Sequence, residues 1–312
     1  GTVHILTATG LAWMSEQISA GNLAGALVML DNDIDLSGKL WTPADFTGSF
    51  DGQGHTITGL TVSRSQEKYL GLFRTIVGTE DNRSFVRNLN FQDVSVYALK
   101  YKGANNYDVS PSFGTVAGYS DFTDYSDITL TGTLTFGGDV EAAGIVYDAT
   151  YDYSRSCKIT NCDLVDVEVY STDDFHGIAE YICNNAEISG CDISGSFVVD
   201  GDFCGIAYEA EYGSRIVDCT VTGTASVGDD LYGIVYDMDY NELDEGDGNG
   251  RNLISGCTVE LTAYAEDDIY GIVGHVYGNS TITDCAVSGS FYAAGDIYGI
   301  MEDMDADMED GE

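Results

Sequence analysis

The sequence has few basic residues, few prolines and no long apolar run. Twelve Lys and Arg stand against 52 Asp and Glu, which gives a formal net charge of −40 over 312 residues. A protein that binds nucleic acid needs a basic surface to neutralise phosphates, and an anionic membrane surface repels a chain of this charge. No apolar stretch reaches the roughly 18 residues of a membrane-spanning helix. We therefore expect neither a nucleic-acid partner nor a transmembrane segment.

Catalytic motifs are also scarce. The four histidines belong to no HExxH zinc motif, and the chain contains neither a GxSxG elbow nor a Walker loop. Asp173–Asp174 lies close to His176, as two carboxylates and a proton carrier would in a glycosidase, but the acidic pair recurs without a histidine at Asp229–Asp230 and Asp267–Asp268. We therefore expect the pair to belong to a repeat and the protein not to be an enzyme. A polysaccharide hydrolase or lyase is the alternative.

The chain is rich in glycine and in aromatic residues. It holds 38 Gly against 2 Pro, with 21 Tyr and 12 Phe, and 44% of its residues are hydrophobic. This apolar content is above that of disordered chains, so the protein should fold around a buried core. Many glycines with few periodic apolar stretches indicate short strands joined by tight turns.

A repeat of about 28 residues organises the C-terminal two thirds of the chain. One phrase, as in ISGCTV, recurs around five cysteines: Cys162, Cys191, Cys219, Cys257 and Cys285. A Gly-Ile pair follows each cysteine at a nearly constant distance, as at Gly205-Ile206 and Gly233-Ile234. Leu60, Leu89 and Leu130 extend the cysteine position upstream, which brings the number of repeats to eight. A unit of this length is too short for a propeller blade and suits one coil of a solenoid.

The predicted fold is therefore all-β: a parallel β-helix of about eight coils, with neighbouring coils about 4.8 Å apart. Residues 1–28 contain the one helical pattern, at Leu11, Met14 and Ile18, and should form an N-terminal helical cap over the first coil. Residues 29–312 should form the β-helix. Insertions interrupt the repeat near 97–127 and 241–251, and insertions on solenoids often lie on a binding face.

The cysteine position should point inward, because leucine fills it elsewhere in the repeat and no pair has the CxxC spacing of a zinc or redox site. Stacked disulfides or a metal site are the alternative. Cys183 and Cys204 lie outside the repeated position, and the sequence leaves open whether they pair.

A carboxylate recurs three residues before each Gly-Ile pair. The members of this column are Asp174, Asp202, Asp230, Asp268 and Asp296, with Glu141 at the same position one coil earlier. Stacked carboxylates repel one another by roughly 1 kcal/mol per neighbour in water. Exposure at a coil corner is one way to relieve this repulsion, and there Asp also stabilises turns. Bound Ca²⁺ is the other, because hard oxygen ligands suit it. No cofactor is required by the sequence, and Ca²⁺ is the one we consider.

A tyrosine precedes the Gly in three coils, at Tyr232, Tyr270 and Tyr298. If this column faces solvent, it forms an aromatic strip that could stack on sugar rings or contact a protein. The alternative is that these tyrosines are present because tyrosine suits strands.

The segment Asn32–Ser63, NDIDLSGKLWTPADFTGSFDGQGHTITGLTVS, followed by Gly71-Leu72-Phe73, closely resembles the opening coils of secreted bacterial proteins with GLUG repeats. The resemblance covers residues 30–300 and weakens toward the end, where Gly-Ile replaces Gly-Leu. It implies a right-handed parallel β-helix and a secreted or cell-surface location, often as an adhesin. Similar repeats accompany immunoglobulin A metallopeptidases, but the zinc motif of those enzymes is missing here, so the resemblance carries over neither that activity nor any catalytic residue.

We therefore expect an extracellular or cell-surface adhesion module that binds a glycan or a host or matrix protein through a repetitive side of the solenoid. The chain begins at Gly1 without Met, which suggests that a signal peptide or a lipid-anchor cysteine has been removed upstream. The sequence does not identify the ligand or the oligomeric state.

Overall fold

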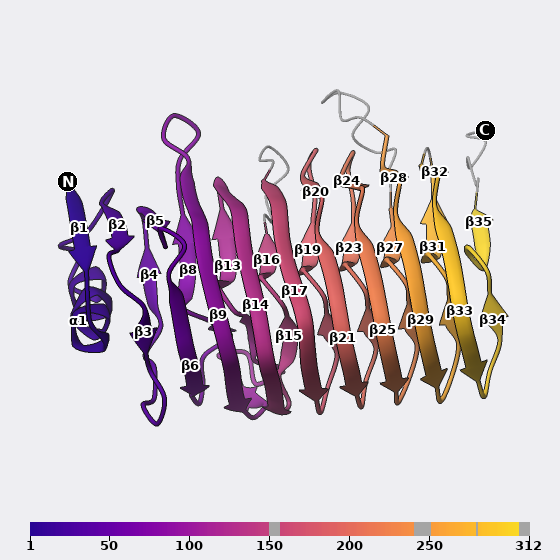
Figure 1. Cartoon of the computed structure of the whole chain (residues 1–312), viewed down its shortest axis with the longest axis horizontal. Coiled ribbons are helices and arrows are strands. Elements are labelled where there is room, and N and C mark those ends of the chain that lie inside the picture. The colour runs from indigo at the N-terminus through magenta and orange to yellow at the C-terminus, as the bar shows by residue number, and fades with distance from the viewer. Residues whose placement is uncertain (150–156, 240–250, 279, 306–312) are drawn as a thin grey trace.

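The structure is a computed structural model, and it describes residues 1–149, 157–239, 251–278 and 280–305. Strands dominate these residues, and they stack one after another from the N-terminal to the C-terminal end of an elongated body (Figure 1). Three sheets run along this body, and every strand pair within them is parallel. The chain is therefore nearly all-β with a β-helix-like architecture.

The largest sheet, with sixteen described strands, forms one side of the body. Its continuous path consists of β1 (Thr2–Ile5), β2 (Leu27–Leu30), β5 (Ser49–Asp51), β9 (Ser84–Ala98), β14 (Thr123–Gly138), β17 (Lys158–Ser171), β20 (Glu187–Ser189), β24 (Arg215–Val217), β28 (Leu253–Ser255) and β32 (Thr281–Thr283). The remaining strands of this sheet are β3 (Ile34–Asp35), β6 (Thr56–Ser63), β21 (Asp192–Val199), β25 (Thr220–Val227), β29 (Thr258–Ala265) and β33 (Ala286–Ala293).

Two further sheets are built from shorter strands. The nine-stranded sheet consists of β4 (Ala44–Phe46), β8 (Phe73–Val77), β13 (Ala117–Asp121), β16 (Val146–Ala149), β19 (Ala179–Ile182), β23 (Ala207–Ala210), β27 (Val235–Met238), β31 (Val273–Tyr277) and β35 (Asp303–Asp305). The eight-stranded sheet consists of β7 (Tyr69–Leu70), β12 (Ser112–Gly114), β15 (Glu141–Ala143), β18 (Phe175–His176), β22 (Phe203–Cys204), β26 (Leu231–Tyr232), β30 (Ile269–Tyr270) and β34 (Ile297–Tyr298).

The strand registers reproduce the repeat. Strand β21 pairs with β25 from Asp192↔Thr220 to Val199↔Val227, a shift of 28 residues without a bulge. The next pairing, Thr220↔Thr258, is ten residues longer. The insertion expected near 241–251 accounts for this difference in sequence, and apart from Arg251 it lies outside the described residues.

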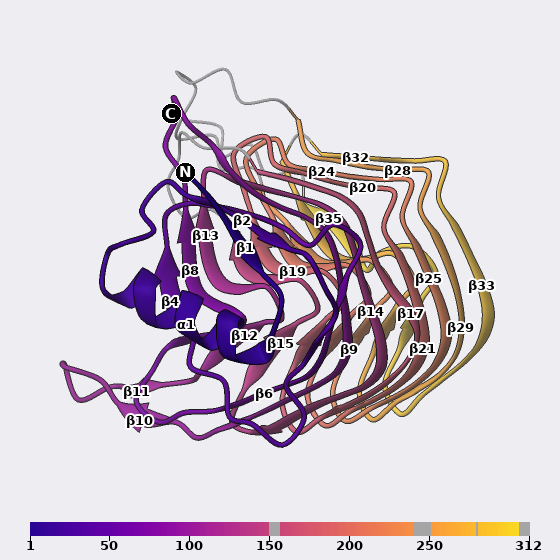
Figure 2. The ribbon, with the colours of Figure 1, turned by 60° about the vertical axis from the view of Figure 1, so that its left-hand side comes forward.

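One helix, α1 (Ala8–Ser19), occurs in the described residues. Thr7 begins it, because its hydroxyl oxygen accepts a hydrogen bond from the Gly10 N–H at 3.1 Å. Leu11, Met14 and Ile18 are buried, as their spacing predicts. The helix packs beside β4 near the N-terminal end of the solenoid (Figure 2), and the boundary expected at residue 28 falls inside β2.

The irregular stretch expected at 97–127 is narrower in the structure. Strand β9 continues to Ala98, and from Ser112 onward β12 and β13 pair in register with neighbouring coils. Between them, β10 (Tyr101–Lys102) and β11 (Asp108–Val109) form an antiparallel hairpin that projects from the body (Figure 2).

The core is continuous along the solenoid, and the cysteine position lies in it. Cys162, Cys191, Cys219 and Cys257 are fully buried, whereas Cys285 in the last coil is partly buried. The register pairs Cys162 with Ile128 and Ile128 with Leu89, so Leu89 lies in the same column, in agreement with the expectation for it. The expectation was wrong for two leucines: Leu130 pairs with Leu164, and Leu60 with Val94. Both are nevertheless buried, because each still points into the core at its own register: Leu130 lies two residues after the cysteine position, and Leu60 pairs with the buried Val94.

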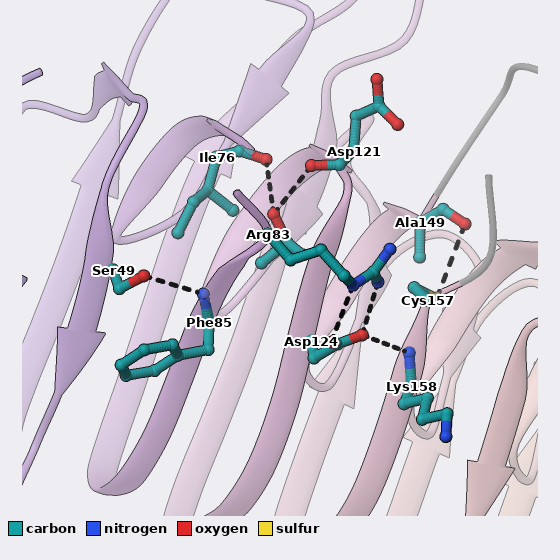
Figure 3. Close-up of polar contacts among 10 residues, drawn as sticks. Ser49, Ile76, Arg83, Phe85, Asp121, Asp124, Ala149, Cys157 and Lys158 are labelled. Carbon is teal, nitrogen blue, oxygen red and sulfur yellow. Dashed lines mark hydrogen bonds and ion pairs between the residues drawn. The ribbon is translucent and has the colours of Figure 1, made fainter. Parts of the chain in front are cut away.

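The few cations join neighbouring coils. Arg83 donates from Nε and Nη2 to the two carboxylate oxygens of Asp124, at 3.0 and 2.6 Å. Asp124 also accepts the backbone N–H of Lys158 at 3.0 Å, so three successive coils meet at one carboxylate (Figure 3).

No helix among the described residues has the length and apolar character needed to cross a membrane.

Candidate functional site: an acidic pocket and the carboxylate column

The expected carboxylate column exists, and a hydrogen-bond ladder connects it. In each coil the Oδ1 atom of the column Asp accepts the backbone N–H of the column Asp in the next coil. The donor–acceptor pairs are Asp202→Asp174 at 2.7 Å, Asp230→Asp202 at 2.9 Å, Asp268→Asp230 at 2.7 Å and Asp296→Asp268 at 2.6 Å. These bonds satisfy backbone donors at the coil corner. The turn-stabilising interpretation therefore accounts for one oxygen of each of the first four carboxylates.

Burial raises the pKa of two carboxyl groups in this column. The pKa of Asp174 is about 6 and that of Asp202 about 7, because burial disfavours the charged form and neighbouring carboxylates add repulsion. The backbone N–H bonds oppose this effect but do not cancel it. Asp174 and Asp202 therefore titrate close to neutral pH.

Three carboxylates at the C-terminal part of the column come close enough to share a cation. Asp230, Asp267 and Asp268 each present a carboxylate oxygen, and these atoms lie within 4.8 Å of one another. Among the described residues this is the group with metal-binding geometry, and it includes two of the five residues expected as Ca²⁺ ligands. Asp174, Asp202 and Asp296 do not belong to it.

The tyrosine column does not form an exposed strip. Tyr232 and Tyr270 are only 3% and 5% exposed, and Tyr298 is partly buried. Their rings stack at 4.8 and 5.0 Å between centroids, and the Tyr232 and Tyr270 hydroxyls donate to Asp230 and Asp268. The expected role in ligand binding required a solvent-exposed column, and Tyr232 and Tyr270 lack that exposure. Tyrosine stacking on tyrosine in successive coils is favourable in itself, which explains the column without a ligand.

The remaining cysteines carry no disulfide. None of the eight cysteines takes part in a disulfide, and both Cys183 and Cys204 are buried. Burial raises the pKa of the Cys204 thiol well above its ordinary value, so it stays protonated and unreactive at neutral pH.

A cavity lies elsewhere, on the nine-stranded sheet beside β11. It has a volume of about 650 Å³. Strands β16, β19 and β23 supply one wall, and β11 with the residues after it supplies another. Carboxylates and tyrosines dominate its lining: Asp108, Glu141, Asp148, Glu180, Glu209, Glu211, Tyr147, Tyr181 and Tyr212. We call this cavity the acidic pocket.

Strand register brings the pocket residues together. Asp148, Tyr181 and Glu209 are direct cross-strand neighbours on β16, β19 and β23. The Tyr147 hydroxyl donates to Glu141 Oε2 at 2.5 Å, and the Tyr181 hydroxyl donates to Glu211 Oε2 at 2.6 Å. Tyrosine hydroxyls thus orient two of the carboxylates.

Burial and mutual repulsion raise the carboxyl pKa values in the acidic pocket. Burial is the main cause for Glu180, whose pKa is about 8, and the charges of Glu141, Asp148 and Glu209 add to it. Burial likewise raises the pKa of Asp148 to about 6, against the opposing charge of Lys68. Near neutral pH the pocket therefore combines a protonated Glu180 with a largely ionised Asp148.

Sequence reasoning missed this pocket. Five of its residues follow the Gly of a Gly-Ile pair, Tyr147 and Glu180 by three positions and Asp148, Tyr181 and Glu209 by four. The acidic residues at these positions were the feature of the sequence that could have indicated the pocket. The contribution of Asp108 could not be predicted, because the direction of the hairpin is a tertiary property.

Comparisons with known proteins support the fold and little else. No family model matches the chain. A segment of 111 residues, 36% of the chain, is 32% identical to halomucin of Haloquadratum walsbyi, and it spans about 1% of that protein. The crystal structure of a putative immunoglobulin A1 protease from Bacteroides ovatus matches 93% of this chain and 83% of its own, with a TM-score of 0.57 and 17% identity. This similarity shows a shared fold.

Proposed function

We propose that the protein is a secreted or cell-surface binding module that recognises a glycan or a host or matrix protein through the acidic pocket. The scaffold is a right-handed parallel β-helix of about eight coils, with α1 as its N-terminal cap, in keeping with the GLUG-repeat resemblance. The observation that carries the proposal is the pocket itself: tyrosines and fixed carboxylates meet beside an inserted hairpin. Aromatic rings and hydrogen-bond acceptors that converge in a concave site are typical of ligand binding.

A glycan array and an array of matrix proteins, probed with the labelled protein, test this proposal. We expect at least one ligand, and we expect Tyr147→Phe to weaken its binding, because this change releases Glu141 from the tyrosine hydroxyl. Tyr264→Phe is the matched control, since Tyr264 is exposed on β29 of the largest sheet. The absence of any ligand on both arrays, or equal binding by wild type and Tyr147→Phe, would contradict the proposal.

A second candidate function is hydrolysis of a polysaccharide, and one observation favours it. A glycosidase needs a carboxylic acid that is protonated near neutral pH beside an ionised carboxylate, and Glu180 with its neighbours has this arrangement. Release of reducing ends from polysaccharides that the protein binds is the measurement. Glu180→Gln should abolish this release in a hydrolase. A bound glycan recovered intact after long incubation excludes the activity for that glycan.

We also propose that Ca²⁺ binds at Asp230, Asp267 and Asp268. Three carboxylate oxygens within 4.8 Å of one another suit a hard cation that completes its coordination with water. Millimolar Ca²⁺ should raise the melting temperature, and EDTA should reverse the rise. Asp267→Asn should reduce the shift, whereas Asp192→Asn, an exposed Asp on β21, should not. An unchanged melting temperature with Ca²⁺ would exclude the site.

A further inference from the structure

The lining of the acidic pocket is charged with one sign. Five carboxylates share one region of it: Glu141, Asp148, Glu180, Glu209 and Glu211. Lys68 is the one basic residue among the described residues that line the cavity, and its ammonium group also lies 4.8 Å from the centre of the Tyr69 ring. The negative charge of the pocket is therefore largely uncompensated by the protein.

One of these carboxylates lacks a partner although it is buried. Asp148 is 8% exposed, and its Oδ1 atom has no hydrogen-bond partner. Its other oxygen, Oδ2, accepts a hydrogen bond of 3.3 Å from the Tyr69 hydroxyl. A buried acceptor without a donor is unfavourable, and such atoms in native structures are often the contacts of a ligand. Asp148 thus marks a place for a hydrogen-bond donor that the protein does not supply.

We propose that the acidic pocket binds a glycan whose sugars carry free primary amino groups. This inference rests on the proposed binding function and specifies its ligand. An ammonium group offers three donors and a positive charge, so it satisfies Asp148 Oδ1 and favours the ionised forms of Asp148, Glu180 and Glu209. The ammonium group should bind ionised carboxylates more tightly than protonated ones, because charge-assisted hydrogen bonds are stronger than neutral ones.

The shape and chemistry of the pocket favour an amino sugar over a lysine side chain. A volume of about 650 Å³ lies in the range of small-ligand sites, roughly 300–1,000 Å³, and is much larger than a single extended side chain. The hydroxyl groups of a sugar donate hydrogen bonds that the remaining carboxylate oxygens can accept. The rings of Tyr181 and Tyr212 add faces on which sugar rings can pack.

N-acetylation of the sugar provides a sharp discrimination. It removes the positive charge and adds a carbonyl oxygen. This oxygen is a hydrogen-bond acceptor, and the carboxylate oxygens that line the pocket are acceptors too. A hexasaccharide of glucosamine and the corresponding N-acetylated hexasaccharide therefore form a matched pair of probes, because they differ in this group alone.

The test is isothermal titration calorimetry of the full chain with both hexasaccharides near pH 7. We expect the amino form to bind at least about tenfold more tightly than the acetylated form. Asp148→Asn and Glu180→Gln should each weaken binding of the amino form by about tenfold or more. Glu260→Gln, an equal charge change on exposed residue Glu260 of β29, should leave it unchanged. Thermal melting of each variant controls for folding.

The pH dependence gives a second readout. Amino groups on sugar rings are largely charged below about pH 6, and lowering the pH from about 6 to about 4 protonates Asp148, whose pKa is about 6, while the ligand keeps its charge. Affinity for the amino form should therefore fall over this range. Rising affinity from pH 6 toward pH 4 would show that the carboxylates do not hold the ammonium group and would overturn the inference.

The remaining outcomes separate this inference from the proposed function. One outcome is equal affinity for both hexasaccharides, with Tyr147→Phe weakening both to the same extent. The pocket would then still be a glycan site, but the requirement for a positive charge on the sugar would be overturned. Tighter binding of a lysine-rich peptide than of the amino hexasaccharide would assign the pocket to a protein partner and overturn the amino-sugar ligand. Binding of neither glycan, together with empty arrays, would overturn both proposals.

Discussion

At the scale of single residues, glycines fix how closely the coils approach. A Cβ atom on Gly177, Gly205 or Gly233 would lie 1.9 to 2.0 Å from the carbonyl oxygen of the equivalent glycine in the next coil. Real Cβ atoms do not approach an oxygen so closely. The Gly of the repeated Gly-Ile pair is therefore required by the neighbouring coil rather than by its own backbone conformation.

Gly205→Ala should destabilise the protein strongly, by about 3 kcal/mol, because the added methyl group forces two coils apart. Gly299→Ala provides the matched control: it changes the same repeat position in the last coil, where no atom lies within 4 Å of the added Cβ. Thermal or urea unfolding measures the difference. Similar unfolding of the two variants would show that the coil spacing adapts easily.

The cysteines permit a second test at this scale. Cys162, Cys191, Cys219 and Cys257 are fully buried, and hydrogen bonding from Cys219 with burial raises the pKa of Cys257 to about 12. A thiol reagent should modify these four only after denaturation, while partly buried Cys285 should react first in the native protein. Mass spectrometry of peptides after brief labelling identifies the sites. Rapid native labelling of Cys219 would contradict the inward orientation.

At the scale of elements, the Asp column is a continuous set of hydrogen bonds between coil corners. Asp174, Asp202, Asp230 and Asp268 each accept one backbone N–H from the next coil. The raised pKa values of Asp174 and Asp202, about 6 and about 7, mean that part of the column is neutral when exposed carboxyl groups are already ionised. The column therefore links coil stability to pH.

The sign of this linkage is definite. Both pKa values exceed the ordinary Asp value of about 3.9, so between about pH 4 and pH 7 the folded chain holds protons that the unfolded chain has released. The stabilisation is complete below the unfolded pKa and is lost as the pH rises through the folded pKa. We expect a lower melting temperature at pH 8 than at pH 5.

Asp202→Asn should flatten this dependence, because an amide oxygen still accepts the Asp230 N–H but does not titrate. Glu260→Gln on exposed strand β29 should keep the wild-type profile. Differential scanning calorimetry from pH 5 to pH 8 is the measurement. A melting temperature that rises over this range would contradict the assignment.

The elements differ in how far the sequence predicted them. The coils were predictable because a fixed interval, such as that between Cys191 and Cys219, repeats the same contacts. The helix was predictable from the spacing of Leu11, Met14 and Ile18. The burial of Tyr232 and the acidic pocket were not, because both depend on how a coil corner turns, and apolar periodicity does not record that angle.

At the scale of the whole molecule, charge is distributed unevenly along the solenoid axis. Residues 159–312 contain 34 of the 52 acidic residues and two of the twelve Lys and Arg. Ion pairs such as Arg83–Asp124 and Arg87–Asp51 lie in the N-terminal half. The C-terminal coils consequently carry most of the electrostatic repulsion.

Salt should therefore stabilise the two halves unequally. Raising NaCl from about 0.02 M to about 0.5 M shortens the screening length from roughly 20 Å to roughly 4 Å. Amide hydrogen exchange should slow more in β25 and β29 than in β6 and β9, because repulsion opens the C-terminal coils locally. Equal slowing along the chain would show that repulsion is not concentrated there.

The 28-residue register between β21 and β25 also bears on how such a protein can change over generations. Each coil makes the same contacts with the coil before it and with the coil after it. A carbonyl oxygen packs against a glycine, a carboxylate accepts a backbone N–H, and one apolar layer stacks on the next. A duplication or loss of one whole repeat therefore creates no interface that was absent before. The length of the solenoid can be altered by recombination in steps of one coil, whereas a gain of one residue within a strand requires a bulge, as between Leu164 and Val167 of β17.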